Sequence, residues 1–156
     1  MTDSVTHATF VLERTYDASP ERVFAAWATQ QAKIRWFVGP DEWERSDHEL
    51  DFRIGGKEHV SGGAPGGPVY AFDAVYQDIV SNERIVTTYQ MHMDAALTSV
   101  SVATVELEPL GSSTKLTYTE QGAFLDELDT AASREEGTAG LLDNLGRELA
   151  RTTAST

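Results

Sequence analysis

The order of periodic segments along the chain constrains the fold more than any other sequence feature. One strand-like segment comes first, two short helical segments follow, six more strand-like segments occupy the middle, and a helical segment ends the chain. Short turn sequences separate the six middle segments, so we expect neighbouring strands to pair antiparallel. The order predicts an α+β domain in which a curved seven-stranded antiparallel sheet wraps around the last helix.

The strand predictions depend on alternating apolar and polar residues between turn-forming residues. In the first segment, Phe10, Leu12 and Tyr16 share one face, as in a half-buried strand. Glycine, proline and asparagine mark most of the turns, for example between residues 62 and 68. The seven predicted strands cover residues 8–16, 43–53, 57–61, 69–79, 84–93, 98–108 and 114–121.

Two short helices are predicted after the first strand. Ser19 is a good N-cap and Pro20 suits the first helical position. Thr29 is the expected cap of a second helix that carries Ile34, Trp36 and Phe37. We expect this second helix to stop at Gly39-Pro40.

The last helix is predicted over residues 130–151, with an apolar stripe of Leu142, Leu145 and Leu149. It also contains three glycines, Gly137, Gly140 and Gly146. Glycine weakens a helix interior by about 1 kcal/mol relative to alanine. Close approach of the helix to the sheet or to a ligand explains all three, and a frayed first half explains Gly137 and Gly140 equally well.

Length and composition limit the classes of protein that this chain can represent. With 156 residues, 40% of them hydrophobic, the chain is expected to form one domain over residues 8–151, with flexible tails at 1–7 and 152–156. It has no cysteine, which is consistent with a reducing compartment, and we expect it in the cytoplasm. A net charge of −13 disfavours nucleic acid as a partner. No apolar run is long enough to span a bilayer, so no membrane partner is predicted either.

The sequence offers little support for metal, nucleotide or acyl-transfer chemistry. The four histidines, His7, His48, His59 and His92, do not have the spacing of a metal site. The segment Gly55-Gly56-Lys57 lacks the remaining residues of a phosphate-binding loop, and no serine lies in a Gly-x-Ser-x-Gly motif. We therefore predict no metal and no cofactor.

Several segments resemble one protein family. They are ERTYDASPERVFAAW (13–27), RWFVGP (35–40), LDFRIGGK (50–57), NERIV (82–86), STKLTYT (113–119) and LDNLGREL (142–149). In this order they resemble the activator of heat-shock-protein-90 ATPase homologue-like family, within the START and birch-pollen-allergen superfamily. The resemblance runs from about Thr9 to Ala150. It implies the helix-grip fold, but the superfamily hosts carriers, receptors and cyclases alike. At Gly137-Thr138 the chain departs from the Gly-Trp of many relatives.

A curved sheet under one helix is expected to leave a concave space that its own side chains do not fill. The candidate ligand-binding residues are Trp36, Tyr70, Phe72, Tyr89, Met91, Tyr118 and Glu120. Alternation along the strands places Tyr89 with Met91 and Tyr118 with Glu120. Packing in the core explains more than half of the aromatic residues equally well.

Three functions follow from these candidates. The first is binding of a hydrophobic or aromatic small molecule without turnover. The second is an enzyme, cyclase-like or hydrolase-like, in which Glu120, with Tyr118 or His59, acts as a general acid or base on a polyketide-like substrate. The third is a chaperone-associated stress-response adaptor, for which an exposed apolar patch is needed. A buried Glu120 with a raised pKa would favour the enzyme, and an ion-paired or solvated Glu120 would favour a structural role.

Overall fold

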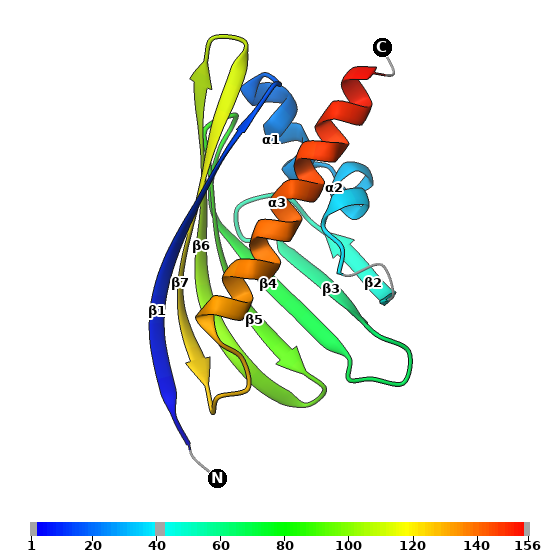
Figure 1. The fold of residues 1–156 in the computed structure, drawn as a ribbon, viewed down its shortest axis with the longest axis vertical. Helices are drawn as coiled ribbons and strands as arrows, with labels where there is room; N and C mark the ends of the chain where they lie inside the picture. The colour runs from blue at the N-terminus through cyan, green and yellow to red at the C-terminus, as the bar shows by residue number, and fades with distance from the viewer. Residues whose placement is uncertain (1–2, 40–42, 155–156) are drawn as a thin grey trace.

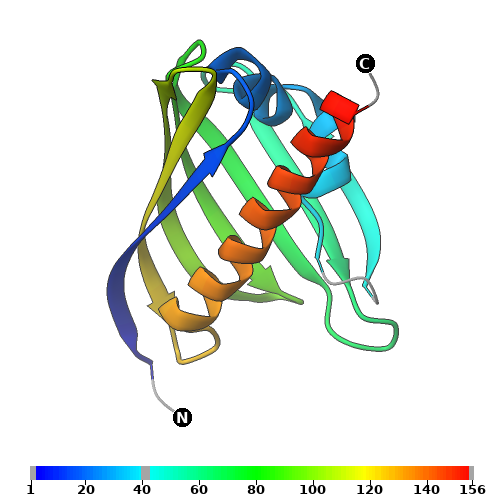
Figure 2. The same ribbon diagram turned by 45° about the horizontal axis from the view of Figure 1, so that its top comes forward.

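The computed structural model describes residues 3–39 and 43–154. Its strands are β1 (Val5–Tyr16), β2 (Glu44–Leu50), β3 (Lys57–Gly63), β4 (Tyr70–Val80), β5 (Arg84–Met93), β6 (Ala96–Leu110) and β7 (Ser113–Leu125). Its helices are α1 (Pro20–Ala28), α2 (Gln30–Trp36) and α3 (Ala131–Ala154). The strands form one antiparallel sheet in the order β1-β7-β6-β5-β4-β3-β2. The sheet curves, and α3 crosses its concave side diagonally (Figures 1 and 2). The predicted helix-grip architecture is therefore confirmed.

Strand pairing arranges the concave face in rows that run across the sheet. One row joins His48 of β2 to Val60 of β3, Phe72 of β4 and Met91 of β5. A neighbouring row joins Glu58, Ala74, Tyr89 and Ser101 on β3 to β6. Because side chains alternate between faces along each strand, both rows point to the same side of the sheet.

The two short helices follow the predicted sequence signals in part. The Ser19 hydroxyl accepts a hydrogen bond from the backbone N–H of Arg22, and Pro20 is the first residue of α1. Thr29 occupies the N-cap position of α2, but its side chain makes no capping hydrogen bond. Helix α2 ends at Trp36, with Phe37 as its C-cap, one turn earlier than the predicted stop. Pro40, part of that stop, lies outside the described residues.

Helix α3 packs against β1, α1 and α2, and its leucine stripe is part of the hydrophobic core. Leu142, Leu145 and Leu149 are buried as predicted, and the backbone carbonyl of Leu142 accepts a hydrogen bond from the Tyr16 hydroxyl. A β-carbon at Gly146 would lie 3.3 Å from the Tyr16 ring, so this glycine allows the helix to approach the sheet closely.

The other two helical glycines have a different environment. A β-carbon at Gly137 or Gly140 would meet no atom within 4 Å, and both residues are exposed. Close approach to the sheet or to a ligand therefore explains Gly146 but neither Gly137 nor Gly140.

Strand β1 and helix α3 extend into the terminal segments 1–7 and 152–156, for which flexible tails were expected. Strand β1 begins at Val5 and pairs with β7 from that residue onward, which places residues 5–7 in the sheet. Helix α3 continues to Ala154. Polar, non-periodic ends give no apolar pattern from which a strand or helix boundary can be predicted. Residues 1–2 and 155–156 lie outside the described residues.

Among the helices of the described residues, none has the combination of length and hydropathy needed to cross a bilayer.

Candidate functional site

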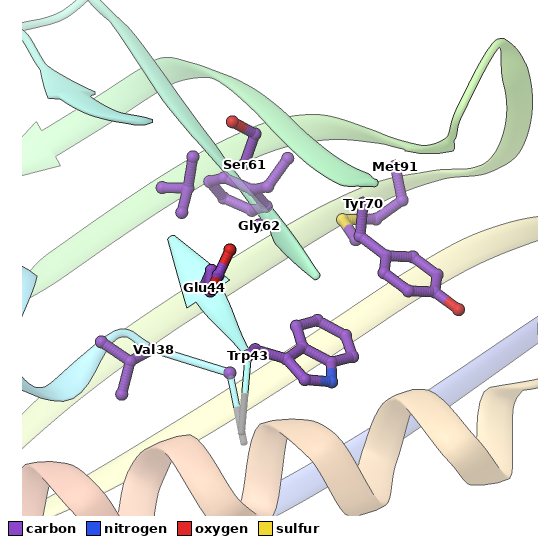
Figure 3. Close-up of a pocket in the computed structure, with 10 residues that line it drawn as sticks. Val38, Trp43, Glu44, Ser61, Gly62, Tyr70 and Met91 are labelled. Carbon is purple, nitrogen blue, oxygen red and sulfur yellow. The ribbon is translucent and has the colours of Figure 1, made fainter. Parts of the chain in front are cut away.

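A cleft of about 280 Å³ opens on the concave face beside α3 (Figure 3). It lies between the segment after α2 and the part of the sheet formed by β2 to β5. Its apolar walls are Val38, Trp43, Val60, Tyr70, Phe72 and Met91. Glu44 and Ser61 are polar residues that also line it. The cleft is therefore mainly apolar and aromatic, as small-molecule sites commonly are.

Trp43 and Tyr70 form one wall of the cleft. Their rings are parallel within 4° and their centroids are 5.0 Å apart. Gly39 packs under the Trp43 ring, where a β-carbon would come within 2.6 Å of an indole carbon. A larger residue at position 39 would therefore move the indole and change the shape of the cleft.

Phe72 connects this cleft to two buried polar clusters. Its ring centroid lies 4.7 Å from that of Tyr89 and 5.2 Å from that of Phe37. Tyr89 belongs to a cluster under the first turn of α3, and Phe37 packs against a cluster between α2 and β3. The apolar cleft is thus separated from each cluster by one layer of aromatic side chains.

The first cluster is centred on Glu120 of β7, which is fully buried. The hydroxyls of Tyr89 and Tyr118 donate hydrogen bonds to the two carboxylate oxygens, at 2.6 and 2.8 Å. Arg134 of α3 donates to one of these oxygens at 3.1 Å and to Tyr89 Oη at 2.8 Å. Burial, together with the Glu120 charge, raises the pKa of Tyr89, and burial raises that of Tyr118. Both phenols stay protonated and act as donors.

Arg134 also attaches the start of α3 to the sheet. Its second terminal nitrogen donates to Ser99 Oγ at 2.8 Å and to Asp129 Oδ2 at 2.7 Å. Burial lowers the pKa of the guanidinium, but the opposite influence of Tyr89, Glu120 and Asp129 is larger and raises it overall. The guanidinium is therefore a permanent cation that compensates the charge of Glu120.

The second cluster is centred on Glu58 of β3, which is also fully buried. Lys33 Nζ and the Tyr76 hydroxyl both donate to Glu58 Oε1 at 2.7 Å, and His48 Nε2 lies 2.9 Å from Oε2. Burial alone would raise the pKa of Glu58, but the Lys33 charge and the three hydrogen-bond donors outweigh it and lower the pKa to about 2. Lys33 Nζ also lies 4.4 Å from the centroid of the Phe37 ring, a cation–π contact.

The seven predicted ligand-binding residues fall into three groups. Tyr70, Phe72 and Met91 line the cleft. Tyr89, Tyr118 and Glu120 share the buried cluster under α3, which confirms that they point inward. Trp36 lies in the core, where its ring makes edge-to-face contacts with Trp27 and Phe37 and its Nε1–H donates to the Ala26 carbonyl.

The sequence interpretation did not assign roles to Lys33, His48, Glu58 or Arg134. Signals for three of them were present. Lys33 lies three residues before Trp36, on the same side of α2, and Glu58 lies two residues before Val60, on the same face of β3. Arg134 is eleven residues, about three turns, before Leu145 on α3. A charged residue on the apolar face of a helix or strand can indicate a buried ion pair, but the sequence does not identify its partner.

His59, which was suggested as a general acid or base beside Glu120, does not line the cleft. Its Nδ1 is 2.5 Å from Asp73 Oδ1, and its Nε2 is 3.8 Å from Asp47 Oδ2. It alternates with Glu58 along β3 and therefore points to the convex face. Across residues 3–39 and 43–154, no group of three or more metal-ligating side chains is present.

The curved sheet, the helix across its concave side and the apolar cleft beside that helix define the class of the protein, a helix-grip domain of the START-like type. The family described as activator of Hsp90 ATPase homolog 1-like protein matches residues 17–150, and the chain belongs to this family. No curated protein matches the chain.

Solved bacterial structures have the same fold. The Mll3558 protein of Rhizobium loti is 49% identical over 93% of this chain and 99% of that chain, with a TM-score of 0.86. A putative uncharacterized protein of Rhizobium leguminosarum is 41% identical over 97% of this chain and 99% of that chain, with a TM-score of 0.91. These similarities extend over nearly the whole length of each chain.

Proposed function

We propose that this protein binds a small apolar or aromatic molecule in the cleft, without turnover. The observation that carries the proposal is the aromatic lining of the cleft. The Trp43–Tyr70 stack, Phe72 and Met91 remain half-buried on the concave face, although large apolar side chains are usually buried when the fold provides cover. A bound apolar ring would cover them.

The size of the cleft limits the ligand to about one or two rings. Its volume of about 280 Å³ is near the lower limit of ligand pockets, roughly 300 Å³. Burying about 250 Å² of a two-ring ligand at about 25 cal/mol per Å² contributes roughly 6 kcal/mol. This corresponds to a Kd of tens of micromolar, before the ordering cost of binding is subtracted.

The geometry of Glu120 favours binding over catalysis. A general base needs a free lone pair directed at the substrate. The Glu120 carboxylate already accepts hydrogen bonds from Tyr89, Tyr118 and Arg134, and it has an ionic partner in Arg134. This arrangement supports a structural role for Glu120, as a clamp between the sheet and α3.

The convex face gives little support to the adaptor hypothesis. Val100 and Val102 of β6 are 41% and 38% exposed. However, strand register places Gln121 of β7 and then Thr9 of β1 beside Val102. Polar side chains therefore interrupt the apolar surface, whereas docking surfaces are commonly contiguous apolar patches.

Titration with naphthalene derivatives tests the proposal, with tryptophan fluorescence as the readout. Trp27 and Trp36 are buried in the core, so saturable quenching should come mainly from Trp43 in the cleft. We expect Met91→Ala to weaken binding about fivefold or more, because it removes apolar contact from the wall. Met93→Ala is the matched control, since Met93 lies two residues further along β5 and does not line the cleft. Absence of saturable quenching in the unmodified protein would refute the proposed function.

A further inference from the structure

One layer of side chains separates the cleft from the buried cluster around Glu58. His48 on the edge strand β2 pairs with Val60, and Val60 pairs with Phe72. Val60 and Phe72 both line the cleft, so His48 continues the same row of side chains toward the sheet edge. The Phe37 ring lies 6.4 Å from the His48 ring and 5.2 Å from the Phe72 ring, centroid to centroid. Phe37 therefore stands beside both the cleft wall and the histidine.

The hydrogen bond between His48 and Glu58 fixes which ring nitrogen carries a proton. Glu58 has a pKa of about 2, so it is a carboxylate at neutral pH and can only accept. His48 Nε2, 2.9 Å from Glu58 Oε2, must then be the N–H donor. In the neutral ring, Nδ1 carries the lone pair and accepts a hydrogen bond.

This acceptor has no partner in the described part of the chain. The His48 side chain is fully buried, and its Nδ1 is a buried polar atom that accepts no hydrogen bond from the described groups, which leave out the side chains of residues 45 and 46. Buried polar groups in folded proteins almost always have a hydrogen-bond partner. An unpaired acceptor beside an apolar cleft therefore favours a ligand that brings its own donor.

We propose that His48 Nδ1 accepts a hydrogen bond from a hydroxyl group of the ligand, so that the cleft selects neutral hydroxylated aromatic molecules. This inference rests on the proposed function. The ring of the ligand lies against Phe72, and its hydroxyl reaches Nδ1 when the half-buried Phe37 side chain turns aside. Phe37 is suited to this movement because it lies just past the last residue of α2.

The charges of the cluster favour a neutral ligand over an anion. Lys33 is the only cation within hydrogen-bonding distance of Glu58 among the described side chains, apart from a protonated His48. The ion pair of Lys33 and Glu58 is already neutral, so a carboxylate ligand would add an uncompensated buried charge. A phenolic hydroxyl adds none.

A set of three ligands of nearly the same shape tests the assignment. 2-Naphthol carries a donor, 2-methoxynaphthalene keeps the oxygen but has no donor, and 2-naphthoate carries a charge. At about pH 8, where an ordinary imidazole is neutral, we expect 2-naphthol to bind about three- to tenfold more tightly than the ether, the effect of one hydrogen bond. We expect 2-naphthoate to bind most weakly.

His48→Gln should remove this preference while retaining the fold. A glutamine amide can still donate to Glu58 from the position of Nε2, but it places no acceptor at the position of Nδ1. In this variant the affinity for 2-naphthol should therefore be about equal to the affinity for 2-methoxynaphthalene. His59→Gln is the matched control, because His59 is hydrogen-bonded to Asp73 on the other face of the sheet. This variant should keep the preference for 2-naphthol over the ether.

Nitrogen-15 NMR of the unmodified protein provides a second readout that does not depend on a variant. Addition of 2-naphthol should shift the His48 Nδ1 resonance, and 2-methoxynaphthalene should not. Equal binding of 2-naphthol and the ether, or tightest binding of 2-naphthoate, would overturn the His48 assignment and leave the proposed function standing. Failure of all three ligands to bind would overturn both.

Discussion

Replacing Lys33 by methionine tests whether the buried Glu58 cluster depends on its ion pair. The Lys33 and Glu58 side chains are only 5% and 1% exposed, so water cannot take over the role of the lost ammonium group. The pKa of Glu58 is about 2, against an ordinary value of 4.5. At about 1.4 kcal/mol for each pKa unit, this difference corresponds to about 3 kcal/mol of folding stability at neutral pH. Breaking a buried pair by removing one partner commonly costs about 3–5 kcal/mol.

The loss of stability in Lys33→Met should depend on pH, and the pKa of Glu58 sets the direction of that dependence. The folded-state pKa of Glu58 is depressed, so its stabilising contribution is fully present above 4.5 and is lost as the pH falls from 4.5 through about 2. In Lys33→Met the carboxylate has lost its compensating cation, and uptake of a proton at Glu58 relieves the imbalance. The difference in the free energy of unfolding between the unmodified protein and the variant should therefore be largest near neutral pH and should shrink as the pH falls.

Urea denaturation at a series of pH values, followed by circular dichroism, measures this difference. Lys115→Met is the matched control, because Lys115 is paired with Glu13 at 3.5 Å on the surface, and such pairs contribute less than about 1 kcal/mol. The double variant Lys33→Met, Glu58→Gln should recover part of the loss, since it removes the unpaired charge. A Lys33→Met loss no larger than that of Lys115→Met, at every pH, would refute the reasoning.

Two further predictions concern α3. Arg134→Leu leaves Glu120 buried without its cation and should cost about 3–5 kcal/mol in urea denaturation, and a loss below 1 kcal/mol would contradict the role of this pair as a clamp. Gly137→Ala should stabilise the protein by up to about 1 kcal/mol in thermal denaturation, because a β-carbon there meets no neighbour. Gly146→Ala should gain less or lose stability, because its β-carbon lies 3.3 Å from the Tyr16 ring, and an equal gain at both sites would contradict the close contact.

The fold could be predicted because its signals are local and repeated. Alternation in residues 8–16 and the leucine stripe of the last helix each report a side that must be buried, and short turns leave antiparallel pairing as the simple solution. Boundaries were less accurate where the pattern fades. β1 begins at Val5 and α3 ends at Ala154, beyond the predicted limits, because backbone pairing and helical hydrogen bonds continue through residues without apolar periodicity.

The candidate site could be predicted only in part. Alternation placed Tyr89 and Tyr118 on the inner face with Glu120, and the structure agrees. Alternation could not show that Arg134, fourteen residues after Glu120, forms an ion pair with this buried carboxylate. Trp43 is not among the candidates taken from the sequence, because its contact with Tyr70 depends on how the segment after α2 meets β4.

The sequence by itself determined the sheet, the helix across it and which strand residues share a face, because these follow from the periodicity of side chains within single segments. Only the tertiary structure decided which inward residues meet. Glu58 is hydrogen-bonded to Lys33, twenty-five residues away, and to His48 on a neighbouring strand. Such contacts depend on strand register and on the position of a helix over the sheet. The free energies that fix them are sums over many residues, so no local pattern reports which pairs form.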